Sequence, residues 1–241
     1  MAKKKIMLFI VEGPTEETSL STVLSRIFSS DTVRFQVVHG DILTKDFVTP
    51  DKIVAAVNEQ VKQVRENIYK PSDFCKIIHL ADMDGVFIPD DVVLQEQVEG
   101  RVYPIYTETN ILSDNRQGIL DRNERKRKNM IRLSSCKKIN GISYSLYYFS
   151  CNLEHVLHGR NNLNDEEKII LANNFDLKYA DEPDAFIHFM RDESFAVPGE
   201  YSETWKFIKE DLHSLERYSN FGLALPDKSE WQQSKTIKSP R

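Results

Sequence analysis

The 241-residue sequence predicts an α/β fold in which helices flank a parallel sheet. Segments of strand and helix character alternate over residues 5–90, and strands that alternate with helices pair in parallel through right-handed crossovers. Two of the predicted strands lead directly into acidic residues, Glu12 and Asp82. Functional groups of open parallel sheets gather at the carboxyl ends of the strands, so the sequence also predicts where a site would lie.

Five segments carry this alternation. The first is a continuous apolar run, typical of a buried strand, and the helical segments show apolar residues at helical spacing. In order they are a strand at Lys5–Val11, a helix at Thr15–Phe28, a strand at Val33–Val38, a helix at Asp51–Asn67 and a strand at Phe74–Ala81. This order places the acidic loops after the first and third strands at the same edge of the sheet.

The alternation weakens after residue 89. Arg101–Tyr106 and Ile142–Phe149 have the composition of strands, Cys151–His158 reads as a short helix or turn, and residues 164–223 are mostly helical in character. We therefore expect an α/β core at residues 1–160 with an insertion at about 90–141, a helical C-terminal region at 161–225, and a poorly ordered polar tail at 226–241.

The composition is that of a soluble globular protein, with 40% hydrophobic residues and a net charge of -5. The three cysteines are odd in number and show no C-x-x-C spacing, which favours a reducing compartment. The apolar run Ile6–Val11 is too short for a signal peptide or a membrane span, and we expect a cytoplasmic protein that contacts no membrane.

Four acidic residues follow the first and third predicted strands: Glu12, Glu16, Asp82 and Asp84. Carboxylates that meet at one sheet edge repel one another unless a cation lies among them. Mg²⁺ takes oxygen ligands and neutralises charge on a transferring phosphoryl group. The pattern therefore predicts a site for a hard divalent ion. The alternative is that these side chains cap helices and face solvent, which is a common role for acidic residues in a first helical turn such as Glu16.

The segments Glu12-Gly13-Pro14-Thr15-Glu16 and Asp82-Met83-Asp84 resemble the Toprim domain, a metal-binding module of topoisomerases, bacterial primases and nucleases of the OLD group. The resemblance covers roughly residues 5–90, with Ile142–Phe149 as a fourth strand. More weakly, the segment 150–155, which contains Glu154, is similar to a late glutamate segment of short Toprim proteins that accompany ABC-type ATPases in phage defence. The long insertion departs from the family pattern.

This resemblance implies a Toprim-like core that acts as a Mg²⁺- or Mn²⁺-dependent endonuclease on DNA or RNA, including tRNA. It implies that Glu12, Asp82 and Asp84 hold metal, with Glu16 and Glu154 as ligands of a second ion. It also implies an effector of antiviral defence that an ABC-type or OLD-like ATPase controls. The chain has no P-loop of its own, so nucleotide hydrolysis would need such a partner.

A basic run follows within the predicted insertion. Cations outnumber anions in the segment 122–138, and clustered Lys and Arg neutralise nucleic-acid phosphates. We expect contact with the nucleic-acid backbone from Arg122, Arg125, Lys126, Arg127, Lys128 and Arg132. A solvated helix face is the competing interpretation.

Two other functions use the same residues. Residues 78–86 also resemble the first motif of haloacid-dehalogenase-type phosphatases, with Asp82 as nucleophile and Asp84 as acid/base. That motif normally opens its fold, whereas here it follows the third predicted strand. The second alternative is a catalytically silent Toprim that serves as a binding module.

Two further expectations concern single groups of residues. His79 lies within an apolar strand, where a hydrogen-bonded core histidine is the usual case. The C-terminal half carries more aromatic residues than one sheet needs, and we expect some of them to form an exposed docking patch for the ATPase or for a second copy of the chain. These aromatic residues are Phe175, Tyr179, Phe186, Phe189, Trp205 and Phe207.

Overall fold

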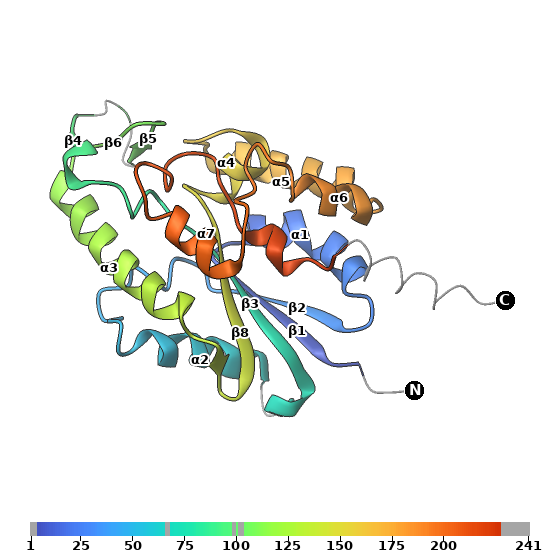
Figure 1. The fold of residues 1–241 in the computed structure, drawn as a ribbon. Coiled ribbons are helices and arrows are strands. Elements are labelled where there is room, and N and C mark those ends of the chain that lie inside the picture. The colour runs from blue at the N-terminus through green and yellow to red at the C-terminus, as the bar shows by residue number, and fades with distance from the viewer. Residues whose placement is uncertain (1–3, 66–67, 98–99, 101–103, 228–241) are drawn as a thin grey trace.

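A central sheet organises the computed structural model, which describes residues 4–65, 68–97, 100 and 104–227 (Figure 1). The sheet has five strands in the order β2-β1-β3-β8-β7, and the first four are mutually parallel. Their bounds are β1 Ile6–Val11, β2 Thr32–Val37, β3 Phe74–Asp82 and β8 Ile142–Phe149, with a short antiparallel β7 at Lys138–Ile139. The predicted α/β class with a mainly parallel sheet is confirmed.

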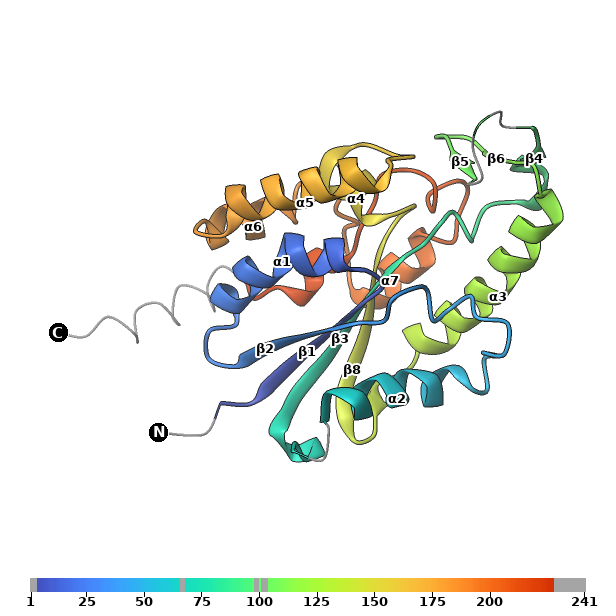
Figure 2. The same cartoon turned by 180° about the vertical axis from the view of Figure 1, so that it is seen from behind.

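Helices cover both faces of this sheet (Figures 1 and 2). One face packs against α2 (Ile53–Arg65), α3 (Arg116–Ser134) and α7 (Tyr201–Phe207). The other face packs against α1 (Pro14–Ile27), α4 (Leu153–His158), α5 (Asp165–Tyr179) and α6 (Pro183–Phe189). Short 3-10 helices lie at Pro71–Asp73, Asp90–Val92 and Phe221–Ala224.

The sequence of β1 explains why helices lie on both faces. Successive side chains of a strand point to opposite sides, and all six residues of β1 are buried. Ile6, Leu8 and Ile10 join the core on the α2 side, whereas Met7, Phe9 and Val11 join the core on the α1 side. An apolar strand of this kind is typical of a parallel sheet that is covered on both faces.

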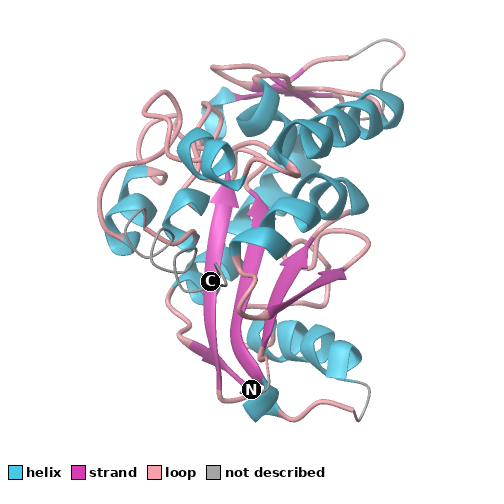
Figure 3. Ribbon diagram, turned by 90° about the vertical axis from the view of Figure 1, so that its right-hand side faces the viewer, coloured by secondary structure: helices cyan, strands magenta, loops and turns pink. Residues whose placement is uncertain are grey.

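The chain reverses direction across the sheet between β1 and β3. It runs from β1 to β2 on one side, through α1, and then crosses back over β1 to β3, through α2 on the opposite face. Ligands of open α/β sheets bind at such a switch point, in the crevice outside the carboxyl ends of the strands. Figure 3 shows these strand ends below a cap of loops and a small second sheet.

The small second sheet belongs to the predicted insertion. It has three strands in the order β4-β6-β5, at Val93–Gln95, Ile111–Ser113 and Ile105–Tyr106. Residues 101–103 of the strand predicted at Arg101–Tyr106 lie outside the described residues. The long helix α3 follows this sheet and runs back along the central sheet to β7 (Figure 1). The basic run therefore lies on a helix that flanks the strand ends.

The C-terminal helices pack into the same core as β1 and β3. Phe175, Tyr179 and Phe186 are buried in the core on the α1 face, and Trp205 is buried on the opposite face. The expectation of an exposed docking patch is wrong for these four residues, because they are buried in the two cores. The large apolar side chains that α5 exposes are Ile169, Ile170 and Leu177. The predicted tail lies outside the described residues from position 228 onward.

No helix in the described ranges has the length and apolar character needed to cross a bilayer.

Candidate acidic site at the strand ends

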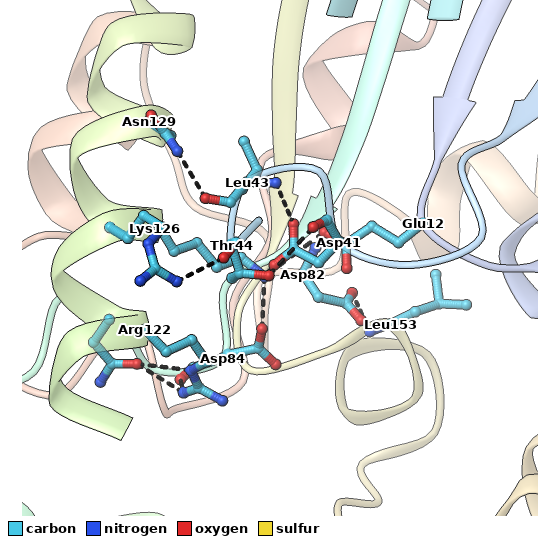
Figure 4. Close-up of polar contacts among 12 residues, drawn as sticks. Glu12, Asp41, Leu43, Thr44, Asp82, Asp84, Arg122, Lys126, Asn129 and Leu153 are labelled. Atoms are coloured by element: carbon cyan, nitrogen blue, oxygen red, sulfur yellow. Dashed lines mark hydrogen bonds and ion pairs between the residues drawn. The ribbon is translucent and has the colours of Figure 1, made fainter. Parts of the chain in front are cut away.

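Each of the four parallel strands leads into an acidic residue at its carboxyl end. Glu12 follows β1, Asp82 ends β3, and Glu154 lies in the first turn of α4, directly after β8. Asp41 lies in the loop after β2, and Asp84 lies two residues beyond β3. The sequence-based prediction that the carboxylates after the first and third strands converge is confirmed by their shared contacts (Figure 4).

Glu12 and Asp82 meet across the neighbouring strands β1 and β3. The backbone N–H of Asp82 donates a hydrogen bond to Glu12 Oε1 at 3.3 Å. Asp82 Oδ1 accepts a hydrogen bond from the backbone N–H of Leu153 at 2.9 Å, at the start of α4. Both carboxylates are partly buried, and they join three strand ends to one another.

Glu16 lies in the first turn of α1 and folds back toward these strand ends. The helix begins at Pro14, a favoured first-turn residue, and a carboxylate in that turn is stabilised by the helix dipole. Glu16 is buried, and a Cβ atom at Gly13 would lie 3.2 Å from Glu16 Oε2. The glycine therefore leaves room for the carboxylate beside the end of β1.

A buried lysine, Lys126 of α3, lies at the centre of three of the carboxylates. Its Nζ atom is 2.6 Å from Asp84 Oδ2, 2.7 Å from Asp41 Oδ2 and 3.7 Å from Glu12 Oε1. Its side chain is 0% exposed. Burial alone would lower the pKa of Lys126, but Asp41, Asp84 and Glu12 raise it well above its usual value. The lysine therefore remains charged.

Asp84 is held in an uncommon backbone conformation by cations on α3. Its φ is +50°, in the left-handed region that non-glycine residues seldom adopt. Arg122 donates to the Asp84 backbone carbonyl at 2.9 Å and to the Tyr106 hydroxyl at 2.7 Å. Burial alone would raise the pKa of Asp84, but Lys126 and Arg122 lower it below its usual value. Asp84 is therefore ionised.

Residues of α3 also fix the two loops that carry Asp41 and Asp84. Arg125 donates to the Thr44 carbonyl at 2.8 Å, and Asn129 donates to the Leu43 carbonyl at 2.7 Å. On the other loop, Arg127 donates to the Val86 carbonyl at 2.8 Å. These side chains bond to backbone groups of both loops, so the helix sets the separation of the loops.

These contacts correct the expectation for the basic run. Lys126 is fully buried, and the side chains of Arg122, Arg125 and Arg127 are partly buried against the acidic loops. Lys128 is exposed and pairs with Glu124 at 2.7 Å. We expected all six cations to contact nucleic acid, but helical periodicity places every third or fourth residue on the inner side of the helix. Of the predicted contacts, Lys128 and Arg132 are exposed.

Asp82, Glu16 and Glu154 form a second group of carboxylates on the α1 side. Burial, and then Glu12, Glu16 and Glu154, raise the pKa of Asp82 well above its usual value. Burial and the neighbouring Glu154 raise the pKa of Glu16 to about 7, against the opposing effect of its hydrogen bonds. Lys168 of α5 lies 3.9 Å from Glu154 Oε2, a longer separation than those around Lys126. Cations therefore compensate the negative charge of this group less closely than Lys126 compensates that of Asp41 and Asp84.

The donor chemistry of the two groups fits Mg²⁺ or Mn²⁺, because all of the side chains offer carboxylate oxygens. The side chains do not form a complete coordination shell. Among the described residues, no group of three or more His, Cys, Asp or Glu side chains is placed to hold a metal ion. Lys126 accounts for part of this, since it occupies the space among Glu12, Asp41 and Asp84.

None of the protein-family models, curated proteins or solved structures compared with the chain matches it. The resemblance to the Toprim domain therefore rests on the two acidic segments and their positions at the strand ends.

One residue of the site, Asp41, was not predicted from the sequence, and two others, Lys126 and Arg122, were predicted in a different role, as nucleic-acid contacts. Asp41 lies in a loop that offers no motif, and Lys126 and Arg122 were assigned to a surface. One signal was present: three apolar positions of α3, at Ile119, Met130 and Leu133, mark an inner face that Lys126 shares. By contrast, His79 is a buried core histidine, as expected, with its ring Nδ1 2.9 Å from the Tyr144 hydroxyl.

Proposed function

We propose that this chain is a Mg²⁺- or Mn²⁺-dependent endonuclease that cleaves phosphodiester bonds of DNA or RNA at the carboxyl ends of its parallel strands. One observation carries the proposal: carboxylates from all four parallel strands gather at the switch point, and burial together with mutual repulsion raises the pKa values of Glu12, Glu16 and Asp82. A divalent cation would relieve this repulsion. The Toprim resemblance of the same residues supports the same chemistry.

The metal would be held by Asp82, Glu16 and Glu154, with Glu12 beside them. A bound Mg²⁺ or Mn²⁺ supplies charge neutralisation at the phosphoryl group and activation of water. The chain's own groups fix the rest of the site. Lys126 forms ion pairs with Asp41 and Asp84 and lowers the pKa of Asp84, the Leu153 N–H donates to Asp82 Oδ1, and the pKa of Glu16 is about 7 in the metal-free protein.

The phosphatase alternative uses Asp82 as nucleophile and Asp84 as general acid. A general acid needs a pKa near or above the working pH, and Lys126 and Arg122 hold the pKa of Asp84 below its usual value. Asp84 is therefore a poor proton donor. The low pKa of Asp84 thus favours phosphodiester cleavage over this alternative. The silent binding module differs from both in that it binds no metal.

Control by a partner is the second part of the proposal and rests on the resemblance to defence-associated Toprim proteins. An ABC-type or OLD-like ATPase would restrain the nuclease in the cytoplasm until infection. The structure offers α5 as a surface for such contact, since its outer side exposes Ile169, Ile170 and Leu177. A second copy of the chain would contact the same surface in a homo-oligomer.

Cleavage assays test the proposed activity. The purified chain, with and without Mn²⁺, would be incubated with labelled single- and double-stranded DNA and RNA, and with p-nitrophenyl phosphate for the phosphatase alternative. Asp82→Asn and Glu12→Gln should abolish metal-dependent cleavage. Asp91→Asn, an equivalent change at an exposed position of the 3-10 helix Asp90–Val92, should leave it unchanged. Metal-independent cleavage, or cleavage retained by Asp82→Asn, would contradict the proposal.

A further inference from the structure

The six acidic side chains at the strand ends form two groups of three, according to their distance from the Lys126 ammonium. Glu12, Asp41 and Asp84 surround the Lys126 ammonium, with the two aspartates at 2.7 and 2.6 Å. Asp82, Glu16 and Glu154 interact with one another, and among the described residues this second half has an ion pair between Lys168 and Glu154, at 3.9 Å. The first half therefore has a cation in close contact with two of its carboxylates, whereas the cation of the second half is more distant.

The lysine fills the position that a metal ion would take in the first half. A lysine ammonium has three donors, and three carboxylates surround this one. A Mg²⁺ or Mn²⁺ ion bound to the same oxygens would lie about 2.0 to 2.6 Å from each of them. That position overlaps the volume of the Nζ atom, and two cations repel each other at this distance. The ion and the ammonium therefore cannot occupy the position together.

Lys126 has no free route away from this position. It is fully buried, and its neighbours on α3 tie the helix to the loops on both sides of it. Arg125 bonds to the loop that carries Asp41, and Arg122 and Arg127 bond to the segment that carries Asp84. To release the ammonium, the protein would have to break two close ion pairs and move a helix that these bonds anchor.

We propose that the Lys126 ammonium permanently occupies the cation position among Glu12, Asp41 and Asp84, so that the acidic edge binds one divalent ion and not two. The ion lies at Asp82, Glu16 and Glu154, beside Glu12. This inference deepens the proposed function and rests on it for the single bound ion. In this arrangement Asp41 and Asp84 are partners of the lysine and not metal ligands, which differs from the role that the sequence motif predicts for Asp84.

The number of Mn²⁺ ions bound per chain tests the proposal. Free Mn²⁺ would be measured by electron paramagnetic resonance during titration of the metal-free protein, together with isothermal titration calorimetry. The wild type should bind one ion per chain. Lys126→Met, which keeps most of the side-chain volume and removes the charge, should bind two. Lys128→Met changes an exposed lysine two residues along the same helix and should still bind one.

Two ions in the wild type, or an unchanged number in a folded Lys126→Met variant, would overturn the proposal. A wild type that binds none while Lys126→Met binds one would support the role of Lys126 but contradict the proposed metal-dependent function. No binding by either protein would contradict both. Circular dichroism would show whether each variant is folded.

A second pair of variants keeps the test decisive if Lys126→Met does not fold. Asp41→Asn retains Lys126 and should change the affinity for the single Mn²⁺ ion by less than about twofold, because Asp41 contacts the lysine and not the metal. Glu16→Gln should weaken the affinity by about tenfold or more, since it removes an anionic ligand. Loss of Mn²⁺ binding in Asp41→Asn with retention in Glu16→Gln would show that the ion binds among the carboxylates around Lys126. That result would overturn the proposal.

Discussion

The Nζ atom of Lys126 lies 2.6 Å from Asp84 Oδ2, inside the protein and at the edge of its parallel sheet. A basic residue in the middle of a helix thereby neutralises an acidic residue that follows a strand more than forty positions earlier in the chain. This ion pair connects the insertion to the acidic edge of the sheet. It also makes the charge state of the edge depend on α3.

Removal of the Lys126 charge should destabilise the metal-free protein. Lys126→Met leaves Asp41 and Asp84 without their cation, and an uncompensated buried charge costs about 3 to 5 kcal/mol. Chemical denaturation in EDTA would measure the free energy of unfolding. Lys128→Met, whose lysine is exposed and pairs with Glu124, should change it by less than about 0.5 kcal/mol. Equal effects of the two variants would show that the Lys126 ion pairs contribute nothing.

The pKa of Glu16 predicts how stability depends on pH when metal is absent. The pKa rises from 4.5 to about 7 on folding, so the folded protein binds the proton more tightly than the unfolded chain. The resulting stabilisation is complete below pH 4.5 and is lost as the pH rises through about 7. In the Glu16→Gln variant the side chain is neutral at every pH, so this loss of stability does not occur.

In thermal unfolding in EDTA, the stability of the Glu16→Gln variant relative to the wild type should therefore increase as the pH rises from 4.5 to 7. The gain should exceed about 1 kcal/mol, or about 2 to 4 °C in melting temperature for a chain of this size. Glu17→Gln, on the exposed side of the same helical turn, is the matched control and should follow the wild type. A constant difference across this pH range would contradict the raised pKa.

The hydrogen bond from Arg125 to the Thr44 carbonyl should restrain the loop that carries Asp41. Arg125→Ala removes this bond, and a hydrogen bond from a charged group contributes about 1.5 to 3 kcal/mol. Part of that energy is screened, because the arginine is partly exposed. Hydrogen exchange should become faster at residues 41–48. Arg132→Ala, an exposed change on the same helix, should leave exchange in this loop unaltered.

The exposed cations near the end of α3 should contribute to nucleic-acid binding, in place of the buried ones. Replacement of Arg132, Lys137 and Lys138 with Ser should weaken binding to every sequence and flatten the dependence of affinity on salt, because fewer counterions are released. Fluorescence anisotropy over a series of salt concentrations would measure both effects. An unchanged salt slope would assign these cations to another surface role.

The central sheet could be predicted because its signals are local. Ile6–Val11 is apolar over its whole length and Ile142–Phe149 is rich in aromatic residues, and the structure has strands at both. Glu12 and Asp82 could be placed together because parallel strands bring their carboxyl ends to one edge. Glu16 and Glu154, which lie in the first turns of the helices after β1 and β8, were predicted through the resemblance to the Toprim domain.

The cationic part of the site could not be predicted because its contacts are distant in sequence. Lys126 bonds to Asp84 across 42 positions, and no local pattern distinguishes its ammonium from that of exposed Lys128. Asp41 is set in place by Lys126 and by its own hydrogen bond to the Leu43 N–H, within a loop that has no periodicity. A run of charged residues in a helix shows that the helix is basic. Which of these side chains face the core and which face solvent depends on tertiary packing.

The most direct test of the central claim is a crystal structure of the protein soaked in Mn²⁺, with anomalous scattering recorded to locate the ion. The account predicts an anomalous peak whose nearest protein atoms are carboxylate oxygens of Asp82, Glu16 and Glu154, about 2.0 to 2.6 Å away. Lys126 should remain between Asp41 and Asp84. The absence of any peak at this edge at saturating Mn²⁺ would contradict the account.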